Sequence, residues 1–162
     1  MSNAKSYLPD GIRTATPTLM QKNCIEAIEW YRRTFGAEVR SISPGPSPGS
    51  TMHAEIRIGD SSIYMADDMP MSSVKSPSLL GGTSSSITLY FSDCDAVFER
   101  SLKAGAQVQM PLDDMFWGDR YGVIKDPFGY MWAIATHKED MTLDELNQRA
   151  RAFFASMPKQ DS

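Results

Sequence analysis

The segment AIEWYRRTFGAEV (residues 27–39) decides the fold, because a related segment, AVFERSLKAGAQV (residues 96–108), follows it 69 residues later. Farther along the chain, IGD (58–60) is echoed by IKD (124–126), 66 residues later. Two copies of a unit of about 70 residues are too few and too long for a solenoid. They predict a duplicated α+β module that folds into one pseudo-symmetric body.

Each module has the pattern of a strand, a helix and three strands, or βαβββ. In the first module we expect a strand over 13–20, then a helix that begins with the capping box Asn23–Glu26 and ends at Gly36. Strands are expected over 38–43, 52–58 and 62–66. The expected buried stripe of the helix comprises Ile25, Ile28, Tyr31 and Phe35.

The second module repeats this order. Asp93 is expected to cap its helix and Gly105 to end it, with a hairpin turn at 126–129. Its strands are expected over 86–91, 107–110, 121–124 and 130–135. We predict one domain over residues 1–140, with modules at about 12–67 and 84–137 joined by a linker at 68–83. Residues 141–162 form a further helix and tail, and the apolar face of that helix requires burial against the body or a partner.

Composition excludes several classes of function. The chain has 162 residues, 41% hydrophobic and 22% charged, with a net charge of −4 and a pI near 5.1. Binding to nucleic acid or to an anionic membrane surface needs basic patches, so we expect neither partner. No apolar run has the length of a membrane span, and residues 1–10 lack the apolar stretch of a signal peptide. We therefore expect a cytoplasmic protein.

The expected strands alternate between an apolar and a mixed face. In residues 52–58, Ala54, Ile56 and Ile58 alternate with polar side chains. The apolar face suits packing beneath the helices, whereas the mixed face carries hydroxyls, aromatic rings and few charges. A concave sheet that encloses a small-molecule cavity explains this face better than solvent exposure, which is the alternative.

Two polar residues of the mixed face are candidates for catalysis. His53 and Glu55 lie two positions apart on one strand and therefore share a face, where a histidine beside a carboxylate could act as a general base. The repeat makes Asp119 and Tyr121 their counterparts, 66 residues later. Trp117 could stack on a ligand or simply pack. A structural hydrogen-bond network or a dimer contact is the alternative for the whole group.

Two further charged residues have simpler interpretations. Arg120 lies near Asp119 and Asp126 in the sequence and is expected to be an ion-pair partner rather than an anion-binding group. His137 ends a strand beside a charged stretch and is expected to be a solvated surface residue.

The two cysteines occupy matching positions of the repeat. Cys24 and Cys94 each lie at an expected helix start, where a thiol pKa can be lowered and the thiol can become reactive. We expect instead that both are small residues that fill semi-buried positions. A disulfide between them is not expected in a reducing compartment.

The tandem βαβββ order and the two repeated helices resemble the glyoxalase/bleomycin-resistance family, the vicinal oxygen chelate superfamily, over residues 12–137. More narrowly, HAEIRIGDSSIYMAD (53–67), FWGDRYGVIKDPFGYMWAIATH (116–137) and the Gly-Gly-Thr before the second module resemble a subgroup labelled 3-demethylubiquinone methyltransferase-like. The label is not a guide to the chemistry. The resemblance implies a curved sheet, or half-barrel, from each module.

The resemblance also implies a position for a divalent metal. Enzymes of the superfamily place one ligand, mostly His or Glu, on the first and one on the last strand of each module. In this sequence those positions hold Thr16, Tyr64, Ser86 and Ala133. Hydroxyls are weak neutral ligands and a methyl group is none, so we expect neither a metal nor another cofactor. The residues that we expect to contact a ligand are Thr16, Thr18, Tyr64, Ser86, Thr88, Tyr90, Trp117, Asp119 and Tyr121.

Three functions follow from these observations. The first is a small-molecule binder without a metal. The second is a lyase, dioxygenase or isomerase of the superfamily that uses His53 and Glu55 or an unrecognised metal. The third is a non-catalytic interaction module that uses its sheet edges and C-terminal helix. A homodimer is expected, because resembling proteins commonly build their cavities across paired modules.

Overall fold

The computed structural model describes residues 6–157, which divide into two compact units. The first unit contains the chain as far as Ser84 together with Phe128–Tyr130, and the second contains Ser85–Pro127 and the chain from Met131 onward. Each unit has one four-stranded sheet. The α+β fold of two βαβββ modules that the sequence predicts is thereby confirmed.

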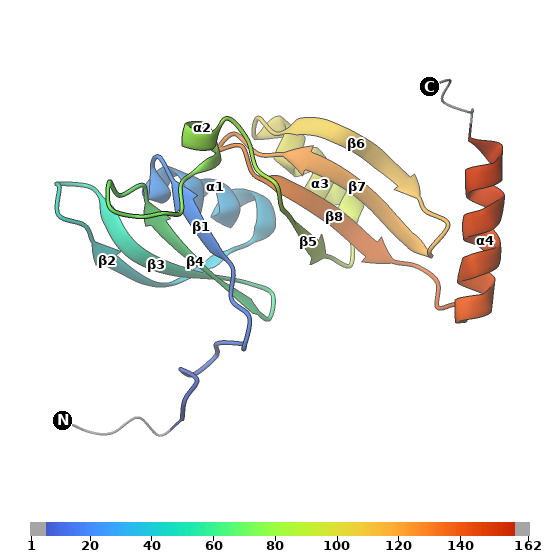
Figure 1. Ribbon diagram of the computed structural model, residues 1–162, viewed down its shortest axis with the longest axis horizontal. Coiled ribbons are helices and arrows are strands. Elements are labelled where there is room, and N and C mark those ends of the chain that lie inside the picture. Colours follow the sequence, from blue (N-terminus) through green and yellow to red (C-terminus); the bar gives the residue numbers. More distant parts are fainter. Residues whose placement is uncertain (1–5, 158–162) are drawn as a thin grey trace. The chain divides into compact units, whose positions relative to one another are not determined.

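The first unit has the strand order β1-β4-β3-β2 (Figure 1). The first and last strands of the module, β1 and β4, pair in parallel, whereas the other neighbours are antiparallel. A short helix, α2, lies in the linker before the second module. The elements are β1 (Thr18–Gln21), α1 (Cys24–Phe35), β2 (Glu38–Pro44), β3 (Thr51–Ile58), β4 (Ser61–Asp67) and α2 (Pro77–Leu80).

The second unit repeats this topology in the order β5-β8-β7-β6, again with its first and last strands in parallel. Its helix α3 packs against β6, β7 and β8. The elements are β5 (Ser86–Tyr90), α3 (Cys94–Lys103), β6 (Gln107–Asp114), β7 (Asp119–Lys125), β8 (Met131–His137) and α4 (Leu143–Ser156).

Local sequence signals account for the limits of α1. The Asn23 side chain accepts a hydrogen bond from the Glu26 N–H, and Gly36 ends the helix with a φ of 69°, a conformation that glycine adopts without strain. One prediction for this helix is wrong. Ile25 is 40% exposed, whereas Trp30 is buried, because the buried stripe is centred on Cys24, Ile28, Tyr31 and Phe35 and leaves position 25 at its edge.

A hydrogen bond between the last strand and the helix start occurs in both units. In the first unit, Asp67 Oδ1 accepts from the Cys24 N–H at 2.6 Å. In the second unit, Thr136 Oγ1 accepts from the Cys94 N–H at 3.0 Å and donates to the Phe91 carbonyl at 2.8 Å. The first N–H groups of a helix have no partner within the helix, so each bond satisfies a donor and fixes the helix start against the sheet.

The turn between β7 and β8 contributes side chains to the core of the first unit. Phe128 packs edge-on against Trp30, with ring centroids 6.3 Å apart, and the Tyr130 hydroxyl donates to the Met20 carbonyl at 2.7 Å. Gly129 has a φ of 94°, and a Cβ there would lie 2.8 Å from the Pro77 Cβ. The turn therefore acts as a packing element as well as a connection.

Other strand limits differ from the predictions. β1 begins at Thr18 rather than at residue 13, because Pro17 has no N–H to donate and the Thr16 hydroxyl instead binds the Arg13 carbonyl at 3.0 Å. β6 continues to Asp114, beyond the predicted end at 110. The capping box of α4 is confirmed at Thr142 and Glu145.

Helix α4 makes limited contacts with the second unit. Phe116, in the β6–β7 loop, lies 5.0 Å from the Phe153 ring and 6.0 Å from the Phe154 ring, measured between centroids. Arg149 binds Glu139 at 2.6 Å. No residue of α4 is fully buried, and its orientation beside the β6–β7 end of the sheet follows from these contacts (Figure 1).

We expect Thr136→Val to lower the free energy of unfolding by about 1–2 kcal/mol, because the Cys94 N–H loses its acceptor and the hydroxyl no longer donates to the Phe91 carbonyl. Thr136→Ser keeps the hydroxyl and is the matched control. Urea unfolding monitored by circular dichroism measures both variants. Equal stability of Val and Ser variants would show that this hydrogen bond does not hold the helix start.

Both cysteines are fully buried free thiols, and burial, followed by the charge of Asp67, raises the pKa of Cys24 to about 12. Since the thiolate is the reactive form, we expect no alkylation of Cys24 by iodoacetamide at pH 8 in the folded protein and complete alkylation in urea. Mass spectrometry of the modified peptides measures this. Rapid labelling of the native protein would restore the reactive interpretation.

Candidate functional site

A hydrogen-bonded network of four side chains lies in the second unit. The Tyr90 hydroxyl donates to Asp119 Oδ2 at 2.8 Å. The other oxygen of this carboxylate, Oδ1, lies 2.7 Å from His137 Nδ1, and His137 Nε2 lies 3.0 Å from Asp140 Oδ1. The Asp119 side chain is only 7% exposed. A carboxylate that is so buried needs these partners, because desolvation alone would be costly.

The strand register explains why these residues meet. Asp119 of β7 is the Cα partner of His137 of β8. Tyr90 of β5 and Tyr121 of β7 are both partners of Ala135, which lies between them on β8. Cα partners present their side chains on the same face of a sheet. The structure thus places Tyr90, Asp119 and Tyr121 on one face of the second sheet.

His137 is more constrained than the sequence suggested. Its side chain is 53% exposed, as expected of a surface residue, but both ring nitrogens also contact carboxylates. The hydrogen bond to Asp119, and then that to Asp140, raises the pKa of His137 above its ordinary value. The sequence predicts the hairpin of β7 and β8, but it does not predict that Asp119 and His137 pair within it.

Aromatic rings adjoin the network. Trp117 lies edge-on to Tyr121, with centroids 5.5 Å apart, and edge-on to Phe116 at 5.0 Å. Trp117 and Tyr121 are half-buried, while Tyr90 is 61% exposed. The hydrogen bond to Asp119 raises the pKa of Tyr90, which keeps it a neutral phenol. This face therefore offers rings and hydroxyls beside one buried carboxylate.

The other predicted residues of the second unit lie on the adjacent strand. Ser86 and Thr88 are exposed on β5, and their Cα partners on β8 are Met131 and Ala133. They share a face with Tyr90, since they are two and four positions away from it.

The predicted residues of the first unit form a separate group. His53 packs edge-on against Tyr64 with ring centroids 4.8 Å apart, and Glu55 Oε1 accepts from the Ser62 hydroxyl at 3.1 Å. Thr18 and Glu55 are both Cα partners of Tyr64. Within residues 6–157 no hydrogen bond or ion pair joins His53 to Glu55, which contact Tyr64 and Ser62 instead. Thr16 lies before β1, outside the sheet.

The register corrects the correspondence between the modules. Tyr64 pairs with Glu55, and its repeat counterpart Ala133 pairs with Val123. The counterpart of Glu55 is therefore Val123, and that of His53 is Tyr121, two residues beyond the positions predicted. A shift of two residues keeps the same face.

The donors at the expected metal positions do not fit a divalent ion of the superfamily type. Thr16, Tyr64 and Ser86 offer neutral hydroxyls and Ala133 offers a methyl group. In the His137 network the two carboxylates bind opposite ring nitrogens, so the three groups do not converge on one point. Across residues 6–157, no group of three or more His, Cys, Asp or Glu side chains could hold a metal.

Arg120 lies outside this network. It forms ion pairs with Asp95 at 2.6 Å and Asp114 at 3.3 Å, so the prediction of an ion-pair role is confirmed but the expected partners, Asp119 and Asp126, are wrong. Asp126 instead accepts from Trp132 Nε1 at 2.7 Å. Alternation along β7 explains the difference, because residues 119 and 120 face opposite sides of the sheet.

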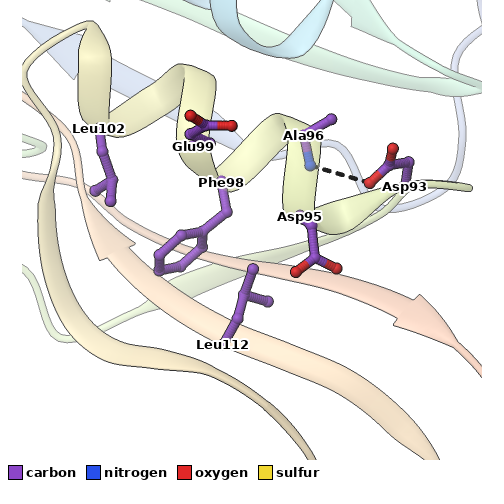
Figure 2. Close-up of a pocket in the computed structure, with 7 residues that line it drawn as sticks. All are labelled: Asp93, Asp95, Ala96, Phe98, Glu99, Leu102 and Leu112. Atoms are coloured by element: carbon purple, nitrogen blue, oxygen red, sulfur yellow. Dashed lines mark hydrogen bonds between the residues drawn. The ribbon is translucent and has the colours of Figure 1, made fainter.

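A surface pocket of about 530 Å³ lies between α3 and β6 (Figure 2). Its acidic side chains already have partners: Asp93 accepts from the Ala96 N–H, Asp95 binds Arg120 and Glu99 binds Lys103. No residue that the sequence predicted for the site lines it. The pocket is lined by Asp93, Asp95, Ala96, Phe98, Glu99, Leu102 and Leu112.

The raised pKa of His137 has a measurable consequence. Its imidazolium form stabilises the fold below about pH 6.5, the ordinary histidine value, and this contribution is lost as the pH rises through the higher folded-state pKa. We expect an NMR titration to place the pKa of His137 above 6.5, and Asp119→Asn to lower it more than Asp140→Asn. The His53→Gln variant, which lacks the other histidine, identifies the NMR resonances of His137. A His137 that titrates at or below the ordinary value would contradict the network.

Comparisons with known proteins agree with this architecture. The family model of the Glyoxalase/Bleomycin resistance protein/Dioxygenase superfamily matches residues 14–134. The uncharacterized protein Rv0887c of Mycobacterium tuberculosis is 40% identical over 134 residues, which cover 81% of this chain and 78% of that protein. Protein YjdN of Escherichia coli is 31% identical over 144 residues, covering 74% of this chain and 92% of that protein.

Solved structures show the same fold. TioX from Micromonospora sp. ML1 is 27% identical with a TM-score of 0.60, covering 80% of this chain and all of that one. A PhnB protein from Bacillus cereus, which carries the 3-demethylubiquinone-9 3-methyltransferase label, is 22% identical with a TM-score of 0.58, covering 76% and 99%. At 22% identity, the likeness to the PhnB protein concerns the fold alone. The repeated βαβββ topology and the family match together show that this chain belongs to the Glyoxalase/Bleomycin resistance protein/Dioxygenase superfamily.

Proposed function

We propose that this protein binds a small organic molecule on the polar and aromatic face of its second sheet, without a divalent metal. The observation that carries the proposal is the network around the buried Asp119 carboxylate, which fixes Tyr90 beside Tyr121. A buried charge that orients an exposed aromatic residue is a feature of functional sites more than of plain sheet surfaces. The donor set at the superfamily's metal positions supports binding without an ion.

The aromatic rings supply the contact area in this proposal. Tyr90, Tyr121 and Trp117 combine apolar faces with polar groups, which suits a planar ligand that needs both stacking and a hydrogen bond. His53 and Glu55 carry the alternative, a catalytic function. Their partners in the first unit are Tyr64 and Ser62, and no hydrogen bond links the two candidates to each other.

Two further expectations concern the cellular location and the oligomeric state of the protein. Within residues 6–157 no helix is both long enough and apolar enough to cross a membrane. A cytoplasmic location and a homodimer stay predictions, which fractionation and light scattering would test.

A thermal-shift screen with planar aromatic fragments tests the function, in parallel with and without EDTA. We expect hits that raise the melting temperature equally in both conditions. Trp117→Ala should weaken the binding of these hits about tenfold, which is the scale of a lost ring contact. Tyr7→Ala is the control, because Tyr7 is an 89% exposed aromatic residue outside the proposed site.

Two results would contradict the proposal. The first is the absence of any hit across the library. The second is binding that EDTA abolishes and a divalent metal restores, which would favour a metal-dependent enzyme of the superfamily. Stoichiometric metal in the purified protein, measured by elemental analysis, would lead to the same conclusion.

A further inference from the structure

Tyr90 is the polar group best placed to meet a ligand on the second sheet. It is 61% exposed and shares its face with Tyr121, and Ala135 stands between the two residues in the strand register. The Ala135 methyl group therefore lies between the two tyrosine side chains on this face. A planar molecule that bridges the two rings on this face would meet the Tyr90 hydroxyl.

The direction of the Tyr90–Asp119 hydrogen bond is determined by chemistry. An ionised carboxylate has no hydrogen to donate, so the proton of the 2.8 Å bond belongs to Tyr90. The same bond raises the pKa of Tyr90, so the phenol keeps its proton. The hydroxyl has already used its one hydrogen, and its oxygen can therefore only accept from a ligand.

The rest of the network prevents a reversal of this direction. Asp119 Oδ1 is held by His137 Nδ1 at 2.7 Å, and the other nitrogen of that ring contacts Asp140 at 3.0 Å. A histidine between two carboxylates is a donor at both nitrogens when charged, so Asp119 Oδ1 accepts in this contact. With 7% of its side chain exposed, Asp119 has little room for another donor in place of Tyr90.

We propose that Tyr90 determines ligand specificity as a hydrogen-bond acceptor, so that the protein selects planar ring compounds that present an N–H or O–H donor at the ring edge. This inference rests on the proposed function and adds the chemical class of the ligand. An ether, N-alkyl or carboxylate group at the same place would bring lone pairs or a methyl group against the Tyr90 oxygen. Such compounds lose the hydrogen bond and leave a desolvated acceptor unpaired.

Indole and 1-methylindole are suitable probes, because 1-methylindole carries a methyl group in place of the N–H hydrogen and is otherwise identical. Ligand-observed NMR titration gives their dissociation constants. We expect indole to bind about tenfold more tightly to the wild-type protein, the scale of one hydrogen bond. In Tyr90→Phe this preference should fall to about one. Tyr7→Phe, which removes an exposed hydroxyl elsewhere, should keep it.

A second variant tests the direction of the hydrogen bond. In Asp119→Asn the amide oxygen accepts from His137, so the amide NH₂ faces Tyr90 and donates to its oxygen. The Tyr90 proton then becomes available, and we expect the preference for indole to be lost even though Tyr90 remains. Circular dichroism and thermal unfolding confirm that each variant is folded.

Distinct outcomes overturn the inference and the proposed function. Equal or tighter binding of 1-methylindole to the wild type overturns the acceptor role, while binding itself still supports the function. A preference that persists in folded Tyr90→Phe shows a steric origin and also overturns it. If neither probe binds the wild type, the inference fails, and the fragment screen alone then decides the proposed function.

Discussion

The hydrogen bond from the last strand to the first N–H of the helix sets the geometry of both units. Asp67 provides it for Cys24, and Thr136 provides it for Cys94. Since each helix connects the two edge strands of its sheet, β1 to β2 and β5 to β6, it must cross over one face of that sheet. That face takes the apolar residues of the alternating strands, and the opposite face is left for polar and aromatic side chains. The duplication thus yields two sheets, each with one face that its helix does not cover.

On the second sheet, the face that α3 does not cover carries a hydrogen bond of fixed direction. Asp119 is buried between Tyr90 and His137, and the network orients the exposed Tyr90 hydroxyl by fixing its proton. The superfamily's usual ligand positions carry hydroxyls and a methyl group. Under the proposed function, recognition on this face depends on ring contacts and on the direction of one hydrogen bond, and it requires no metal ion.

The sequence predicted what depends on local pattern. The repeat gave the topology, Asn23 and Thr142 gave helix starts, and alternation gave the faces of the strands. It did not predict what depends on register across the sheet. The pairing of Asp119 with His137 requires the β7–β8 turn length, and the partners of Arg120 lie on α3 and β6. Neither relation is visible from the spacing of residues along the chain, and the role of Phe128 in the first unit was missed for the same reason.

A crystal structure with a bound fragment, collected with anomalous data at transition-metal edges, tests the central claim most directly. We expect ligand density against the rings of Tyr90 and Tyr121, a ligand hydrogen-bond donor within reach of the Tyr90 oxygen, and no anomalous peak on protein side chains. Density confined to the pocket between α3 and β6, or an ion coordinated by the protein beside the ligand, would contradict it.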